Sequence, residues 1–587
     1  MLSWGVGNYA DETLLSTMPK QETVAAPPPP RERSVTIIAQ DPSVRVDDEI
    51  LLARITIPAE SLSPGPVGYR VEVIDFDATT DTLYTPASPA NLDRWSKLPA
   101  KGLGDRLVGE PEFHRHNVYA LVMKTLSRFE FALGRRINWG FDGHQLKVAP
   151  HAFSEANAFY SDRLNALLFG YFRDVRGKPV YTCLSHDIIV HETTHALIDG
   201  LRERYREPSS SDQAAFHEGF ADVVALLSVF SLPSVIEQTI DRSPGDRPLS
   251  TKELSREALR KSMIFGLAEQ VGDELNVARG PLRHSLRDIV PGPGYYKDDE
   301  EFLEAHRRGE LLVAAMLTAF VEMWSRRLVA LIRDRQRVDR SRAIEEGADI
   351  ADCLLTSAIR ALDYAPPVDV TFGDYLSALL TADREIRPSD TRYELRASVL
   401  DSFRKFGIEP ASGTPDGCWK PAPPNLDYSR THFDPMRRDH DEVFHFVWEN
   451  RKVLGLHAEA FTRVTTVRPC MRVGADGFVL NETVCEYVQI LEPLASELQS
   501  LGMRKPKDMP AEKKLRLFGG GALIFDEYGR LKYHVYNPLR SVDRQQERLD
   551  FLWESGALRG ESTARLSISN LHLRRATRSK KHAEEEW

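Results

Sequence analysis

The chain has 587 residues, of which 42% are hydrophobic and 28% charged, and its net charge is −10. This balance is typical of a soluble globular protein of two to four domains, and the acidic charge argues against nucleic acid as a partner. The longest apolar runs, residues 223–230 and 311–320, are too short to span a bilayer, so no membrane contact is expected.

The N-terminal residues lack the basic region and apolar core of a signal peptide. The five cysteines are odd in number and scattered along the chain, which favours free thiols in a reducing compartment. We therefore expect a cytoplasmic protein.

The start of the chain is predicted to hold a disordered segment and a small β module. Residues 1–34 are polar and end in a run of prolines, which is typical of an extended spacer. Residues 35–105 contain β-rich runs bounded by Pro, Gly and Asp, and they predict a β-rich N-terminal module without catalytic chemistry.

A long helix is predicted from Phe113 to Arg136, where apolar residues recur at helical spacing. His114 and His116 lie at its start. Side chains two residues apart on a helix point in different directions, so we expect both histidines at the surface and not as joint metal ligands. Further along, residues 157–171 end in an alternating pattern that predicts a strand, whose edge could bind an extended peptide.

The most informative stretch is His191-Glu-Thr-Thr-His195, on a predicted helix. Residues four apart share one helix face, so His191 and His195 can bind one metal ion, with Glu192 near the metal-activated water. A catalytic zinc ion needs three protein ligands and one open position. Ile198 and Leu201 stand where a metzincin has Gly and His, so the third ligand must come from further along the chain.

A second predicted helix, residues 211–227, supplies a candidate for that ligand. Glu218 and Asp222 lie four residues apart on this otherwise apolar helix, where buried carboxylates need partners. Both are satisfied if Glu218 binds the metal and Asp222 accepts a hydrogen bond from the free nitrogen of His191.

These motifs resemble the thermolysin family of zinc metalloendopeptidases, which are glutamate-zincins with His-Glu-x-x-His followed by Glu-x-x-x-Asp. The resemblance covers roughly residues 110–405, and Asn157-Ala158-Phe159 is similar to the family's substrate-binding edge strand. It implies a thermolysin-like zincin domain over residues 106–410, with an α/β N-terminal half and a helical C-terminal half. The Gly-x-Met-Glu-Asn motif of related aminopeptidases is absent, so an endopeptidase is favoured.

The resemblance also implies roles for residues outside the metal motifs. Tyr205 stands where the family has a catalytic tyrosine, and His306 where it has a histidine that closes the site, with His284 as the alternative. Arg283, or alternatively Arg287, would contact the substrate carbonyl.

The expected function is hydrolysis of peptide bonds in a protein or peptide substrate, with one catalytic Zn²⁺. The ion activates water and polarises the scissile carbonyl. Glu192 acts as the general base, and Tyr205 and His306 donate hydrogen bonds to the oxyanion. The alternative is a catalytically silent zincin-fold scaffold, or interaction protein, with a structural zinc.

The chain departs from the family pattern in several respects. The loop between His195 and Glu218 is a few residues longer than usual, and His217 replaces the usual Asn beside the third ligand. No acidic cluster clearly matches the family's calcium sites, so calcium binding is left open.

The helical half is completed by further helices that periodicity and stop signals predict. Asp349, Asp352 and Asp363 fall among them, and we expect them on a solvated face and not in a second metal site. The predicted helices span residues 252–272, 300–330, 343–361, 372–383 and 394–406.

A stretch rich in Pro, Gly and Ser at residues 410–424 predicts a domain boundary. It is followed by an α+β C-terminal domain of unknown role, residues 411–570, with a hairpin between 461 and 488 and another turning at Tyr528-Gly529. This domain is a possible site for a regulatory protein partner, and residues 571–587 are expected to form a disordered charged tail. The fold class expected for the whole chain is α+β.

Overall fold

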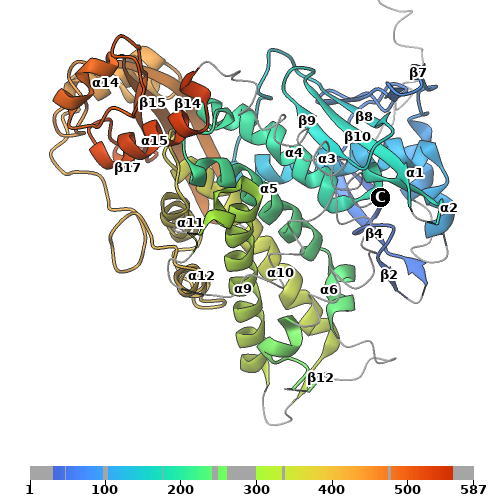
Figure 1. Cartoon of the computed structure of the whole chain (residues 1–587). Helices are drawn as coiled ribbons and strands as arrows, with labels where there is room; N and C mark the ends of the chain where they lie inside the picture. Colours follow the sequence, from blue (N-terminus) through green and yellow to red (C-terminus); the bar gives the residue numbers. More distant parts are fainter. Residues whose placement is uncertain are drawn as a thin grey trace, which may run out of the picture.

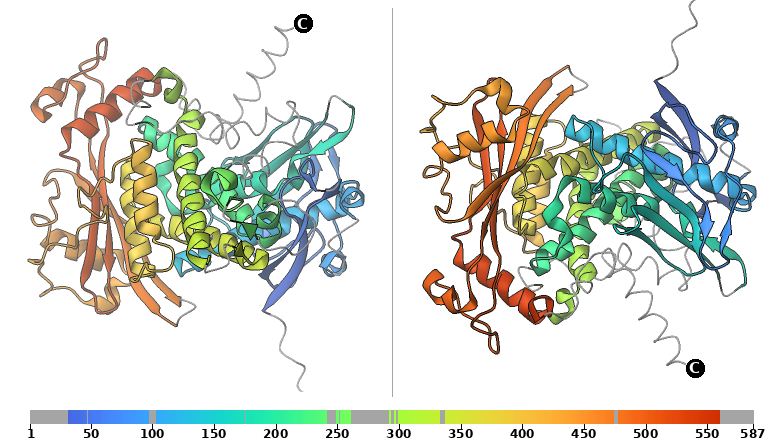
Figure 2. Two further views of the ribbon diagram at one scale, coloured as in Figure 1. Left: turned by 90° about the horizontal axis from the view of Figure 1, so that it is seen from below. Right: turned by 90° about the horizontal axis from the view of Figure 1, so that it is seen from above.

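Helices and strands both contribute large parts of the protein, which confirms the α+β class. In Figures 1 and 2 the strands of the first half lie at one end, the C-terminal sheet lies at the other, and long helices lie between them. Arg283, His284, Arg287, residues 571–587 and nearly all of residues 1–34 fall outside the described residues. The computed structural model describes residues 31–46, 48–96, 103–174, 176–240, 249–250, 252–260, 292, 296, 299–332, 337–473 and 477–559.

A five-stranded mixed sheet forms the scaffold of the first half. Its strands β5, β8 and β10 run parallel, and β9 and β11 both pair antiparallel with β10. Because β5 lies within residues 35–105, that region and the following one share a sheet. The strands are β5 (Val71–Val73), β8 (Leu146–Phe153), β9 (Ala158–Ser161), β10 (Ala166–Arg173) and β11 (Pro179–Tyr181).

Several smaller elements accompany this scaffold. The antiparallel ribbon β1 (Glu32–Ile38) and β4 (Leu52–Pro58) packs on the long helix α3. The other short elements are β2 (Arg45–Val46), β3 (Glu49–Ile50), β6 (Phe76–Asp77), β7 (Thr82–Leu83), α1 (Ala90–Ser96), α2 (Gly104–Val108), β12 (Leu249–Ser250) and β13 (Arg337–Val338).

Helix α3 (Pro111–Leu133) confirms the long helix predicted near this position. It ends earlier than predicted because Gly134 adopts a left-handed conformation, φ 67°, which is a common helix stop. The prediction that His114 and His116 lie at the surface is wrong, since each exposes only 1% of its surface. Strands β1, β4, β5 and β8 and helix α4 all pack against α3, so even its polar side chains lie inside the protein.

The second half of the scaffold is helical, as predicted. Helix α5 packs along α9 and α4, and α10 crosses both α5 and α9. The predicted helix 252–272 lies largely outside the described residues. The helices are α4 (His186–Leu201), α5 (Ser211–Phe230), α6 (Pro233–Thr239), α9 (Ala305–Leu331), α10 (Arg340–Arg360), α11 (Phe372–Ile386) and α12 (Leu395–Lys405).

Over the described ranges, no single helix is both long and apolar enough to cross a bilayer. Helices α5 and α6 reach that length and apolarity only when taken together, and they meet at a bend of 87°.

The C-terminal region is built on a four-stranded antiparallel sheet in the order β14-β15-β16-β17. The two predicted hairpins are confirmed, and Gly529 in the second turn has a φ of 79°. The elements are α13 (Phe433–Met436), α14 (His440–Glu449), β14 (Phe461–Val473), β15 (Val479–Leu491), β16 (Leu517–Phe525), β17 (Leu531–Asn537) and α15 (Val542–Glu554).

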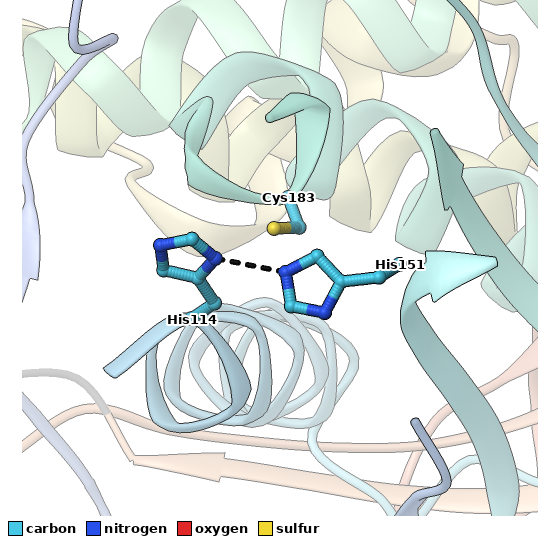
Figure 3. A group of neighbouring side chains, drawn as sticks. All are labelled: His114, His151 and Cys183. Atoms are coloured by element: carbon cyan, nitrogen blue, oxygen red, sulfur yellow. Dashed lines mark hydrogen bonds between the residues drawn. The ribbon is translucent and has the colours of Figure 1, made fainter. Parts of the chain in front are cut away.

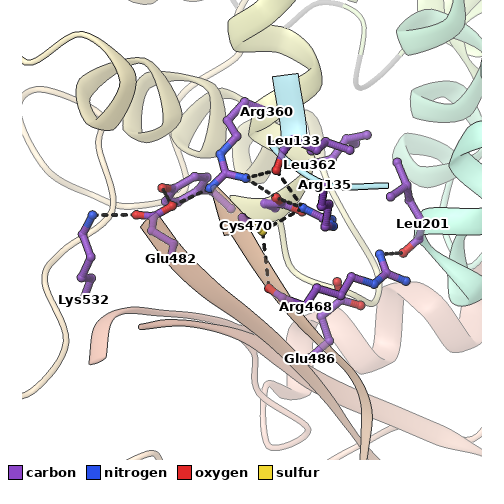
Figure 4. A network of polar contacts seen from close by, with 12 residues as sticks. Leu133, Arg135, Leu201, Arg360, Leu362, Arg468, Cys470, Glu482, Glu486 and Lys532 are labelled. Carbon is purple, nitrogen blue, oxygen red and sulfur yellow. Dashed lines mark hydrogen bonds and ion pairs between the residues drawn. The ribbon is translucent and has the colours of Figure 1, made fainter. Parts of the chain in front are cut away.

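A buried ionic network joins this sheet to the helical half (Figure 4). Asp363 pairs with both Arg135 and Arg360, and Arg360 also pairs with Glu482 on β15. Lys532 lies 2.6 Å from Glu482. The expectation that Asp363 lies on a solvated face is wrong, because this side chain exposes 1% of its surface and neutralises two buried arginines.

Candidate metal centre

Helix α4 presents two histidines toward the same point. His191 and His195 are four residues apart, and their Nε2 atoms lie 2.9 Å from each other. The intervening Thr193 and Thr194 donate their hydroxyl protons to carbonyls one turn back, at 2.6 and 2.7 Å. These polar residues are therefore satisfied within a buried helix, and the two imidazoles remain directed together.

Glu218, on α5, completes a converging set of three ligand atoms. Its Oε2 atom lies 3.5 Å from Nε2 of His191 and 3.7 Å from Nε2 of His195. All three ligand atoms lie within 4.8 Å of one another. Two imidazoles and one carboxylate are a ligand set of catalytic zinc sites, so the chemistry of these donors fits Zn²⁺.

Asp222 lies one helical turn beyond Glu218 and faces His191. Its Oδ1 atom is 2.7 Å from Nδ1 of His191, so that nitrogen donates its proton and Nε2 is left for a metal. Burial by itself lowers the pKa of His191, but the carboxylates of Asp222, Glu218 and Glu192 together outweigh burial and raise it well above 6.5. In the metal-free chain a proton therefore competes for this site.

His195 has a corresponding partner that sequence reasoning did not assign. Nδ1 of His217 lies 2.7 Å from Nδ1 of His195, and its Nε2 atom lies 3.6 Å from Oδ1 of Asp199. All three side chains are buried. The one available signal was that His217, directly before Glu218, replaces the Asn usual in the family that the motifs resemble. The sequence could not show that this side chain lies against α4.

Glu192 links the metal helix to the edge strand β9. The backbone N–H of Tyr160 donates to Oε2 of Glu192 at 2.9 Å. This N–H points away from β10, and backbone groups alternate along a strand, so Ala158 presents its backbone on the same side. Asn157 precedes the strand, and its carbonyl accepts a hydrogen bond from the Gly170 amide at 2.9 Å.

His306 lies in the first turn of α9 and reaches the same centre. Its Nε2 atom is 3.4 Å from Oε2 of Glu218, and its Nδ1 atom is 2.7 Å from Oε1 of Glu304. Burial alone would raise the pKa of Glu304, but its interactions with the His306 ring and with the backbone N–H groups of His306 and Arg307 together outweigh burial, and the pKa falls to about 2. Glu304 is thus a carboxylate that orients the imidazole.

Two glycines allow α9 to approach α5 this closely. A Cβ atom on Gly219 would lie 2.7 Å from the carbonyl oxygen of Gly309, which is too short for any real contact. The crossing of α5 and α9 therefore needs glycine on both helices, and it brings His306 beside Glu218.

The prediction that Tyr205 donates to the oxyanion is wrong. Tyr205 exposes 1% of its surface, and its hydroxyl donates to the carbonyl of Pro366 at 2.6 Å. After α4 ends, a 3₁₀ turn (Glu203–Arg206) folds this ring into the core, where it packs edge-on against Phe216. Its hydroxyl is hydrogen-bonded inside the protein and does not face the histidines.

The other implied substrate residues, Arg283 and its alternative Arg287, lie outside the described residues, as does His284. No protein-family model matches the chain, and no curated protein matches it. The case for a metal centre therefore depends on the geometry of the described side chains.

Proposed function

We propose that this protein is a zinc-dependent metalloendopeptidase with a thermolysin-like zincin domain, acting on protein or peptide substrates. One observation carries the proposal: His191, His195 and Glu218 converge on one point, and the carboxylate of Glu192 lies beside them. His191, His195 and Glu218 would hold the ion. When bound, Zn²⁺ supplies Lewis-acid chemistry that activates water and polarises a carbonyl.

Glu192 is the general base in this proposal. It follows His191 directly on α4, is almost fully buried, and is held by the Tyr160 amide. A carboxylate in this position takes a proton from the attacking water and passes it to the leaving amine. A purely structural zinc site has no need of such a residue next to its ligands.

The edge strand β9 provides a place for the substrate chain. Extended peptides bind to exposed strand edges through backbone hydrogen bonds. The outward side of β9 carries the backbone of Ala158 and adjoins Glu192, so a peptide paired there would pass the base. Asn157 sits at the entrance of the same strand.

Because Tyr205 is buried elsewhere, His306 alone is assigned as the hydrogen-bond donor to the oxyanion. Glu304 accepts a hydrogen bond from its Nδ1 atom, which directs the Nε2 atom toward the Glu218 carboxylate. Because Nδ1 already carries the proton that Glu304 accepts, Nε2 can donate only when the ring is an imidazolium. In that form it would lie within reach of a carbonyl oxygen bound near the ligands, where a preorganised donor stabilises developing negative charge.

The test is peptide cleavage by the full-length, zinc-loaded protein, measured with a library of internally quenched peptides. Glu192→Gln should keep its zinc and lose roughly 100- to 10,000-fold in rate. Glu203→Gln, an exposed glutamate just beyond the metal helix, is the matched control and should cleave normally.

Two results would decide against the proposal. Full activity in a zinc-replete Glu192→Gln variant removes the base assignment. Stoichiometric zinc in a wild-type chain that cleaves no peptide in the library favours the scaffold with a structural zinc.

A further inference from the structure

A second group of metal-ligating side chains lies at the junction of α3, β8 and the 3₁₀ turn Thr182–Leu184, which directly precedes α4 (Figure 3). It consists of His114 from α3, His151 from β8 and Cys183 from the turn, and all three are buried. One nitrogen of each histidine and the sulfur of Cys183 lie within 4.8 Å of one another. This group shares no residue with the candidate metal centre.

The outer nitrogen of each imidazole is already committed as a donor. Nε2 of His114 lies 2.8 Å from the carbonyl oxygen of Val108, and this oxygen can only accept. Nδ1 of His151 lies 3.0 Å from both carboxylate oxygens of Asp75, which is itself paired with Arg115. A neutral imidazole has one N–H, so in both rings that proton is on the outer nitrogen.

The two inner nitrogens then both carry lone pairs. Nδ1 of His114 and Nε2 of His151 face each other at 2.9 Å, and Cys183 lies beside them (Figure 3). Two lone pairs at that distance repel unless something positive lies between them. That is either a proton, which makes one buried ring an imidazolium, or a metal ion.

We propose that His114, His151 and Cys183 bind a second, structural metal ion of the class that prefers imidazole and thiolate, with Zn²⁺ as the expected occupant. A histidine that donates its other N–H to a carboxylate or a backbone carbonyl is the usual arrangement of a metal-bound histidine, and this cluster has one of each. Nitrogen and sulfur donors together are typical of zinc ligands.

The two inner nitrogens need only a small adjustment to share an ion. Zinc–nitrogen bonds of about 2.0–2.1 Å place two tetrahedral ligands about 3.3 Å apart, so the rings must separate by about 0.4 Å. Binding displaces the thiol proton of Cys183 to solvent and leaves a thiolate on the metal. These three side chains supply three ligands, and within the described part of the chain no fourth side chain joins the group.

The role of the ion follows from where its ligands come from. Cys183 is three residues ahead of the first residue of α4, and its backbone carbonyl accepts from Asn117 on α3 at 3.2 Å. The neighbouring Thr182 hydroxyl donates to Gly170 on β10 at 2.9 Å. An ion here ties α3 and the sheet to the start of the helix that carries His191 and His195.

The experiment uses the full-length chain, first measured for zinc content and then exchanged with Co²⁺. Wild type should hold two zinc ions per chain, and Cys183→Ser and His114→Gln one each. The Co²⁺ form should show a sulfur-to-cobalt charge-transfer band in the near ultraviolet, because His191, His195 and Glu218 include no sulfur ligand. The band should vanish in Cys183→Ser and persist in Cys485→Ser, which removes an equally buried thiol on β15.

A wild-type chain that shows no thiolate band at saturating Co²⁺ would overturn the proposal, and this result needs no variant to fold. A band that survives Cys183→Ser would overturn it as well. In the first case the 2.9 Å contact between the two inner nitrogens is bridged by a proton and not by a metal ion. The readout is independent of peptide cleavage, so a chain that cleaves nothing can still show the band.

Discussion

Replacing Asp222 should weaken zinc binding, less for Asn, which keeps a hydrogen-bond acceptor, than for Ala, which removes it. Asp222 accepts a 2.7 Å hydrogen bond from His191, and both side chains are largely buried. Loss of such a partner typically costs roughly 10- to 100-fold in metal affinity, or about 1.4 to 2.8 kcal/mol. We expect about 10-fold for Asp222→Asn, whose amide oxygen still accepts the bond without charge, and about 100-fold for Asp222→Ala.

The assay is a competition titration of each full-length variant against a fluorescent zinc chelator. The zinc site to be measured is identified as the one whose binding signal is lost in His195→Ala. Asp212→Asn is the control. Asp212 lies on the same helix, but its carboxylate pairs with Arg308 at 2.6 Å, so this variant should lose stability and keep its zinc affinity. Wild-type affinity in Asp222→Ala would refute the argument that this carboxylate orients His191 as a ligand.

A pH series sharpens the same test. Burial lowers the pKa of His191, but Asp222, together with Glu218 and Glu192, raises it well above 6.5, and the ring must lose its proton to bind metal. The apparent zinc affinity of wild type should therefore rise steeply as pH increases from about 6 to about 8. This window is chosen to include the ordinary pKa range of histidine and pH values above it. Asp222→Asn should show a shallower rise, and identical slopes would contradict this reasoning.

The remaining predictions concern the oxyanion donors and the ionic network. Tyr205→Phe should lose about 1 kcal/mol of stability in denaturant titrations and keep kcat, since its hydroxyl bonds a core carbonyl; a large loss of kcat would reinstate it as a donor. His306→Ala should lower kcat roughly 100-fold while zinc content stays constant, whereas loss of zinc would make it a ligand. Asp363→Asn should cost roughly 3–5 kcal/mol because two buried arginines lose their partner, and Asp352→Asn, in a half-exposed pair, less than about 1 kcal/mol. Burial would raise the pKa of Asp363, but those arginines lower it, so its contribution is complete above the ordinary value of 3.8 and is lost as pH falls below it.

The candidate centre was predictable in its ligands because they follow from local rules. His191 and His195 share a face on any α-helix, and the same spacing relates Glu218 to Asp222. A pair of carboxylates on an apolar helix needs buried partners, and this argument alone placed Asp222 against His191. The strand at Ala158 was anticipated only through the family resemblance. The alternating residues up to Tyr171, expected to form an edge, lie on β10, which pairs with β8, β9 and β11 inside the sheet.

The positions that sequence reasoning missed depend on how elements meet. Tyr205 has the sequence position expected of a catalytic tyrosine, but the turn after α4 directs it into the core. His114 and His116 looked like surface residues of one helix, yet that helix is enclosed by strands of both sheets, by the ribbon of β1 and β4, and by helices α4 and α10. His217 becomes the partner of His195 only because α5 lies alongside α4.

The sequence by itself therefore determined helices α4 and α5, the faces on which His191, His195, Glu218 and Asp222 lie, and the α+β class, because helical periodicity and four-residue spacing act over short distances. Tertiary structure decided which further side chains contact each candidate ligand. The crossing at Gly219 and Gly309 brings His306 to Glu218 across about ninety residues, and β8 brings His151 to His114. Such contacts depend on side-chain volumes at helix and sheet interfaces, and no local pattern encodes them.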